Sequence, residues 1–137
     1  MRSNEFEVTA TAGNLHPVPA SGIKFPHVWT EDGVVVESAF TGAHLLHLSV
    51  AGCVLNDVYR EAETLGIVVD GVKVVVWGDF DRETFHSTGV KYQVEGNSNA
   101  DDSEVGELIR VVDEVAEMPK ALRAEAVVRR VDISTRS

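Results

Sequence analysis

The chain contains a single cysteine, Cys53, within the stretch HLSVAGCVLND that spans residues 47–57. A cysteine acts as a nucleophile or redox group through its thiolate, which a nearby cation or the start of a helix stabilises. A cysteine packed among apolar side chains behaves instead as a small hydrophobic residue. The sequence therefore offers two alternatives for Cys53, a functional thiol or a buried structural side chain.

The residues around Cys53 supply no activating group. On a helix, the neighbours expected to line a pocket beside the thiol are Ser49, Val50, Asn56 and Asp57. None of them is a cation, and a carboxylate at Asp57, one turn after Cys53, disfavours the thiolate by charge repulsion. If Cys53 is reactive, a remote residue such as Lys24 or Arg123 must supply the cation. Both alternatives stay open on these residues alone.

Two histidines precede the cysteine at a spacing that could bind a metal ion. His44 and His47 lie three residues apart, and a cysteine sulfur could complete such a site. However, the six residues from His47 to Cys53 turn a helix by about 240°, so the three side chains do not share a face. We therefore predict no metal site. A glycine-rich phosphate loop is also absent, and we predict no cofactor.

Length and charge restrict the classes of function. The 137 residues fit one domain covering residues 1–137, and the net charge of -10 makes binding to nucleic acid or an anionic membrane unfavourable. No apolar run approaches the ~20 residues of a membrane-spanning helix. One cysteine cannot form a disulfide within a subunit, which suits a reducing compartment. We predict a cytoplasmic protein.

The first half of the sequence predicts strands followed by one long helix. Alternation predicts a strand at residues 6–13, and three prolines restrict residues 15–26 to a loop or a hairpin edge. A β-branched run predicts another strand at 33–40. Thr41 and Gly42 then favour a helix start, and Gly66 favours its end. Cys53 is expected near the middle of this helix.

The second half predicts two strands, helices and a final strand. Residues 69–80 are apolar on both faces for most of their length, which is typical of a covered central strand. Residues 89–96 alternate as a second strand. Asp101 and Glu104 resemble a capping box for the next helix, which Pro119 should end or kink. A short helix at 120–126 and a closing strand at 127–134 complete an α+β order.

The central helix also predicts a second subunit. It is too apolar to lie on a surface, and small residues at Ser49, Ala51 and Gly52 beside the cysteine would let another backbone approach closely. In a chain of this length, the apolar helix is most simply buried by a second subunit. We predict a homodimer whose central helices pack near Ala51, Gly52 and Cys53.

Three segments of the chain resemble the OsmC/Ohr family of osmotically inducible and organic hydroperoxide resistance proteins. They are the run TGAHLLHLSVAGCVLNDVYREAETLGIVVDGVKVVVWGDFD, the later helix that ends in EVAEMPK, and the closing strand. The resemblance implies an intertwined α+β homodimer with active sites at the subunit interface. It also implies an oxidative-stress function in which a thiol reduces organic hydroperoxides. Cys53 stands at the position of the peroxidatic cysteine.

The other positions implied by the resemblance carry different residues. The family's resolving cysteine precedes a proline, where this chain has Met118, and its activating glutamate falls on Ala43. Its arginine, from the first hairpin, falls on Asn14. With Met118 no internal disulfide can form, so an oxidised Cys53 would need an external thiol or a second chain to recover. Two functions follow: weak or lost one-cysteine hydroperoxide reduction, or a non-catalytic dimer that binds a small apolar ligand or is only structural. Whether the protein is an enzyme stays open.

Overall fold

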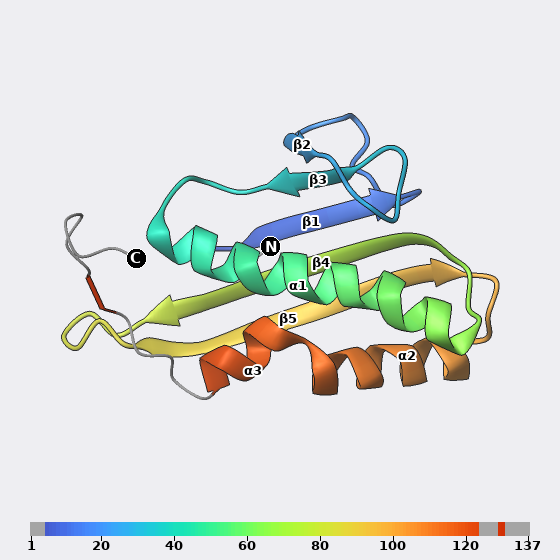
Figure 1. The fold of residues 1–137 in the computed structure, drawn as a ribbon. Coiled ribbons are helices and arrows are strands. Elements are labelled where there is room, and N and C mark those ends of the chain that lie inside the picture. Colours follow the sequence, from blue (N-terminus) through green and yellow to red (C-terminus); the bar gives the residue numbers. More distant parts are fainter. Residues whose placement is uncertain (1–4, 124–128, 131–137) are drawn as a thin grey trace.

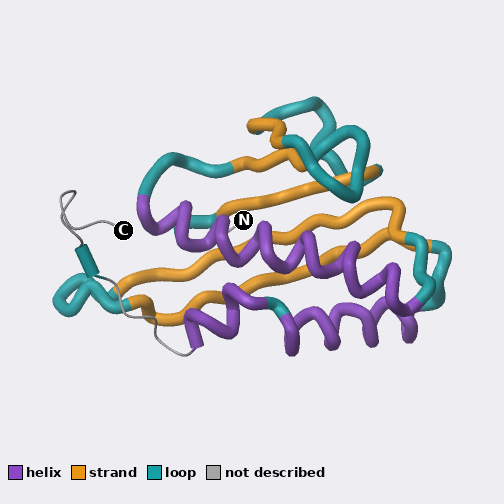
Figure 2. Tube along the Cα trace, in the orientation of Figure 1, coloured by secondary structure: helices purple, strands orange, loops and turns teal. Residues whose placement is uncertain are grey.

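The computed structural model describes residues 5–123 and 129–130. Its elements, in chain order, are β1 (Val8–Gly13), β2 (Ile23–Phe25), β3 (Val34–Glu37), α1 (Gly42–Leu65), β4 (Val69–Phe80), β5 (Ser87–Ser98), α2 (Asp102–Val115) and α3 (Glu117–Arg123). The strands form one antiparallel sheet in the order β2-β3-β1-β4-β5. All three helices lie along one face of it (Figures 1 and 2). The predicted α+β class is confirmed.

The core lies between α1 and the middle of the sheet. Alternate residues of β1 and β4 pair across the strands and point toward the helix, as in the pairs Val8–Val76 and Ala10–Val74. These side chains are fully or almost fully buried. Helix α1 covers them with Val50, Ala51, Val54, Leu55, Val58 and Ala62. The long helix is therefore held rigidly on the sheet by its apolar face, which fixes where Cys53 projects.

The predicted ends of the long helix are confirmed. The Thr41 hydroxyl accepts a hydrogen bond from the His44 N–H at 3.2 Å and so caps the first turn. Gly66 ends the helix in the left-handed region with φ 70°, which a glycine adopts without a Cβ penalty. The second long helix starts as predicted too, since the Asp101 carboxylate accepts from the Glu104 N–H at 2.8 Å.

Two expectations about the second half need correction. Strand β4 is interior to the sheet but covered on one face only: Lys73 is exposed and Val75 half-buried on the other, because every described helix lies on the same side. Helix α2 ends at Val115, before Pro119. That proline is the third residue of α3, where its missing N–H costs no helical hydrogen bond. The predicted closing strand at 127–134 lies largely outside the described residues.

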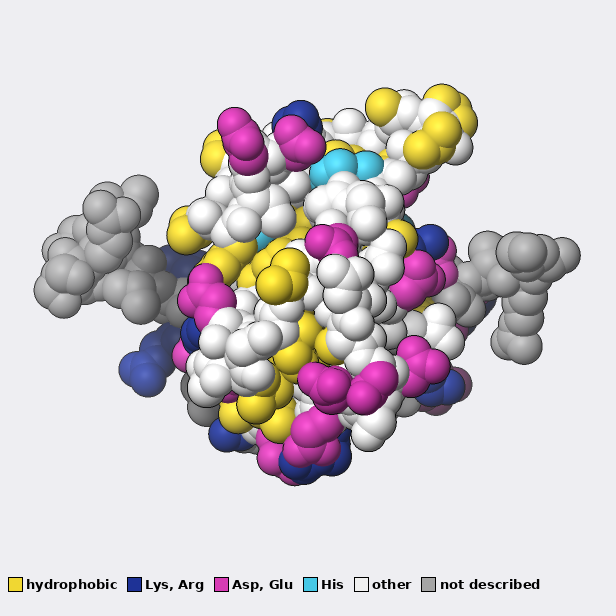
Figure 3. Space-filling view, turned by 90° about the vertical axis from the view of Figure 1, so that its right-hand side faces the viewer, with side chains coloured by type: hydrophobic (Ala, Val, Ile, Leu, Met, Phe, Trp, Pro, Cys, Tyr) yellow, Lys and Arg dark blue, Asp and Glu magenta, His cyan; other side chains and the backbone are white. Residues whose placement is uncertain are grey.

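The surface of α1 also differs from the prediction. Ala51 is 0% exposed and packs into the core of its own subunit, so it cannot contact a partner helix. The helix turns this small residue toward the sheet, whereas Gly52 and Cys53 stay partly exposed. Apolar side chains reach the surface elsewhere, among acidic ones (Figure 3). The most exposed large ones are Val18, Val28, Phe40 and Phe85. None of the described helices is long and apolar enough to cross a membrane.

Candidate functional site

Cys53 lies midway along α1, on the border between the buried and the open side of the helix. Its side chain is partly buried and packs against the edge of the core. Within the described part of the chain, no hydrogen bond to the sulfur is present. The thiol is therefore reachable, but the residues that the structure describes in one subunit supply no hydrogen bond that would stabilise its thiolate.

One turn after the cysteine, Asp57 is a buried carboxyl group. It is 5% exposed, its Oδ1 lies 3.0 Å from a guanidinium nitrogen of Arg60, and its Oδ2 has no partner in the described residues. Burial raises the pKa of Asp57, and the opposing effect of Arg60 is smaller. The structure thus shows a partly paired, buried carboxyl group at the position where the sequence places a carboxylate one turn after Cys53.

The other polar residues expected beside Cys53 are engaged in structural hydrogen bonds. The Ser49 hydroxyl donates to the Leu46 carbonyl at 2.6 Å. The Asn56 side-chain oxygen lies 2.9 Å from Nε2 of His27, whose Nδ1 lies 2.7 Å from the Thr30 hydroxyl. This chain of hydrogen bonds ties the segment between β2 and β3 to α1. Asn56 thus fastens a loop to the helix.

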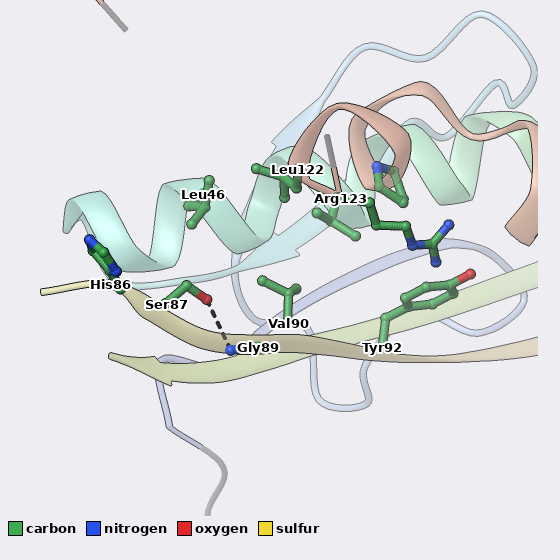
Figure 4. A pocket seen from close by; sticks show the side chains of 10 residues that line it. Leu46, His86, Ser87, Gly89, Val90, Tyr92, Leu122 and Arg123 are labelled. Carbon is green, nitrogen blue, oxygen red and sulfur yellow. Dashed lines mark hydrogen bonds between the residues drawn. The ribbon is translucent and has the colours of Figure 1, made fainter. Parts of the chain in front are cut away.

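A cavity of about 680 Å³ opens between α1, β5 and α3 (Figure 4). Its wall is made by Leu46, Val50, His86, Ser87, Gly89, Val90, Tyr92, Pro119, Leu122 and Arg123. Val50 belongs to this wall, whereas Ser49, Asn56, Asp57 and Cys53 do not. Cys53 follows Val50 by three residues on the same flank of α1. The cavity therefore lies beside the cysteine and does not enclose it.

The polar groups of the cavity are concentrated at its ends. Arg123 and Tyr92 lie at one end, and His86 and Ser87 at the other (Figure 4). Behind the first end, Asp113 of α2 accepts a hydrogen bond from the Tyr92 hydroxyl, and its Oδ1 lies 3.1 Å from an Arg123 nitrogen. The bond from Tyr92 lowers the pKa of Asp113, while burial and that same bond raise the pKa of Tyr92.

Sequence reasoning found only part of this arrangement. Arg123 was expected as a possible remote cation for Cys53, and it lies instead on the wall of the cavity. Lys24, the other candidate, is exposed on β2, at the opposite edge of the sheet from β5. Tyr92 and Asp113 were missed as site residues. Their only sequence signals are strand alternation and a place on an amphipathic helix, which do not indicate contact between them.

The three positions at which the resemblance predicts a departure from the family pattern are spread through the fold. Ala43 is partly buried in the first turn of α1, and Met118 is partly buried in α3 directly before the cavity residue Pro119. The Asn14 N–H donates to the Asp70 carbonyl at 2.9 Å, beside the start of β4. These three residues therefore lie in three different parts of the fold, and none of them bears a group that could activate a thiol.

The two histidines near the start of α1, His44 and His47, form hydrogen bonds with neighbouring parts of the fold. His44 Nδ1 lies 2.6 Å from the Thr41 hydroxyl at the helix start. His47 is fully buried and its Nδ1 lies 2.8 Å from the Phe6 carbonyl oxygen. Across residues 5–123 and 129–130, no group of three or more His, Cys, Asp or Glu side chains is placed to hold a metal ion.

Comparison with known proteins agrees with this fold. The model of the OsmC-like protein family matches residues 35–130, most of the chain. An OsmC-like protein from Mycoplasma pneumoniae superposes with a TM-score of 0.57 at 15% identity, over 90% of this chain and 89% of that one. An OsmC-like hydroperoxide resistance protein from Jannaschia gives a TM-score of 0.51 at 14% identity, over 96% and 97%. A search of curated proteins gives no match. On the strength of the family match, supported by the shared fold, the chain belongs to the OsmC-like family.

Proposed function

We propose that this protein reduces organic hydroperoxides slowly, with Cys53 as its single redox thiol. One observation carries the proposal: Cys53 is partly exposed in the central helix, three residues after Val50, which lines an apolar cavity. The cavity could accommodate the organic part of a hydroperoxide beside the sulfur. The hydroperoxide resistance protein from Jannaschia, which shares this fold, supports the same class of reaction.

The reaction requires a thiol from solution. The thiolate of Cys53 attacks the terminal oxygen of R–O–OH, the O–O bond breaks, and the leaving alkoxide takes a proton to become ROH. The sulfur is left as sulfenic acid. A first external thiol condenses with it to a mixed disulfide and releases water, and a second displaces the cysteine and leaves as the external disulfide. Met118, at the resolving position, cannot replace either thiol. A reducing compartment such as the cytoplasm would supply them.

The surroundings of Cys53 in one subunit favour a slow first step. In the described residues no cation is hydrogen-bonded to the sulfur, and Asp57 lies one turn away along α1. A thiol without a stabilised thiolate reacts slowly, because only the ionised fraction attacks. We propose that a second copy of the chain covers the open side of α1 near Gly52 and Cys53, which would make the protein a homodimer.

The test is oxidation of the purified protein with a limited excess of cumene hydroperoxide. We expect mass spectrometry to find sulfenic or over-oxidised Cys53, or a disulfide between subunits, and we expect added dithiothreitol to give slow turnover. The Cys53→Ser variant should lose this turnover while keeping the far-UV circular dichroism of the parent. An unmodified Cys53 after long exposure would mean that the sulfur is sealed, and consumption at the rate of a dedicated peroxidase would refute the predicted slowness.

A second function is supported by the separation of the cavity from the cysteine. Because Cys53 does not line the cavity, the space could bind a small apolar molecule without chemistry at sulfur. Its volume lies in the range of small-molecule sites, roughly 300–1,000 Å³. In this case the Cys53→Ser variant would bind apolar probes as the parent does, and hydroperoxide consumption would be no faster than that of a free thiol.

A further inference from the structure

We propose that the cavity between α1, β5 and α3 binds a small organic acid, with its apolar chain against the cavity wall and its carboxylate paired with Arg123. The inference rests on the cavity being a binding site, the second function above, and adds the class of ligand. It is independent of the chemistry at Cys53, which does not line the cavity.

The body of the cavity selects an apolar chain. Most of its wall is aliphatic or aromatic, contributed by Leu46, Val50, Val90, Pro119, Leu122 and the ring of Tyr92. Apolar atoms that replace water against such a wall gain about 25 cal/mol for each Å² removed from water. A ligand without an apolar part would leave this surface wet and gain little.

The charge of the cavity wall selects an anionic head group. The chain has 22 Asp and Glu residues and a net charge of -10, yet none of the described residues that line the cavity is acidic. Among these described lining residues, the guanidinium of Arg123 is the permanent charge. A carboxylate that enters the cavity therefore meets a cation, whereas an ammonium group would meet repulsion.

The guanidinium of Arg123 is oriented but not saturated. One of its terminal nitrogens lies 3.1 Å from Asp113 Oδ1, and the other lies 3.5 Å from the Asp113 carbonyl oxygen. A guanidinium has five N–H donors, so donors remain for a ligand. Asp113 is not part of the cavity wall, and its Oδ1 is shared between Arg123 and the Tyr92 hydroxyl. This arrangement fixes the arginine at the end of the cavity while its partner carboxylate stays behind it.

Titration calorimetry with three probes of equal chain length tests the inference: octanoate, 1-octanol and octylammonium. We expect octanoate to bind at least tenfold more tightly than the other two. The Arg123→Gln variant should lose this preference but keep octanol binding, and Arg123→Lys should keep part of it. The matched control is Arg110→Gln, which makes the same change of charge at an exposed arginine paired with Glu107 and Glu114 on α2. This control should keep the full preference.

Each contrary result has its own meaning. Equal binding of octanoate and octanol would overturn the carboxylate inference and leave an apolar binding site. No binding of any probe would overturn both the inference and the second function. Loss of preference in Arg110→Gln, or in His86→Gln instead of Arg123→Gln, would refute the role of Arg123. The Cys53→Ser variant should bind octanoate like the parent, so failure of the hydroperoxide proposal leaves this test intact.

Discussion

The open side of α1 gives a direct test of the proposed homodimer through Gly52. A Cβ built at Gly52 meets no atom of the described residues within 4 Å outside its own helix, and the same is true of Gly106 on the exposed side of α2. In a single subunit, both positions therefore have room for a larger residue. If a second copy packs its helix near Gly52, the space is filled there and remains open at Gly106.

A glycine-to-leucine substitution is expected to change the stability of the protein in opposite directions at Gly106 and at Gly52. Replacing an exposed helical glycine by alanine stabilises a helix by about 1 kcal/mol, and leucine is nearly as favourable. Gly106→Leu should therefore raise the stability of the protein by up to about 1 kcal/mol. At Gly52, leucine should instead overpack the helix contact at a cost of roughly 1–3 kcal/mol. If that cost falls on association, the dimer dissociation constant rises about 5-fold to 150-fold.

The assay combines sedimentation velocity over a dilution series with thermal unfolding at several protein concentrations. We expect a parent dimer whose midpoint temperature rises with concentration, as mass action requires. Gly52→Leu should shift the dilution series toward monomer, and Gly106→Leu should leave it unchanged. A monomeric parent at micromolar concentration, or a Gly52→Leu variant that is stabilised as much as Gly106→Leu, would refute the dimer contact at Cys53.

Three further predictions concern single side chains. Met118→Cys should allow an internal disulfide with Cys53 after oxidation, detected as a faster-migrating band on a non-reducing gel, provided the two Cα atoms come within about 7 Å; its absence at full oxidation would argue against the proposed resolving position. Asp113→Asn should cost stability at neutral pH, and this cost should disappear as pH falls, because the folded-state pKa of Asp113 is lowered below 3.8 and its contribution is lost on protonation. Asp57→Asn should show the opposite trend: the pKa of Asp57 is raised above 3.8, so the parent gains stability relative to this variant as pH falls through the raised value. Urea unfolding between pH 3 and 7 measures both, and parallel pH profiles would contradict these assignments.

The local elements of this fold could be predicted from the sequence because their signals are local. The side-chain oxygen of Thr41 and the free backbone of Gly66 fix the ends of α1 wherever the helix is placed. The run of residues 69–80, apolar on both faces for most of its length, predicted a strand with the bounds that β4 has. The family resemblance also followed from these segments, since the cysteine, the helix and the strand after it are contiguous in the chain.

The predicted contact at Ala51 failed for a geometric reason. Small residues at three nearby positions show that something approaches the helix closely, but residues 51 and 52 point about 100° apart. The side of α1 that carries Ala51 packs against β1 and β4 of the sheet, and this packing is visible only in the tertiary structure. The sequence of β4 left a similar question open. Its residues are apolar on both sides, and this pattern does not show that all described helices lie on one side of the sheet.

What the sequence determined by itself is the single cysteine, its place in a long helix, and the residue types at Ala43 and Met118, where the resemblance implies an activating glutamate and a resolving cysteine. These are properties of residue identity and local spacing. Only the tertiary structure decided that Val50 faces a cavity and that Tyr92, Asp113 and Arg123 meet at one end of it. The three residues come from β5, α2 and α3, and periodicity tells which side of each element is apolar but not which element it will face. That choice is made by packing all elements around one core, where burial energy depends on contacts between segments far apart in the chain.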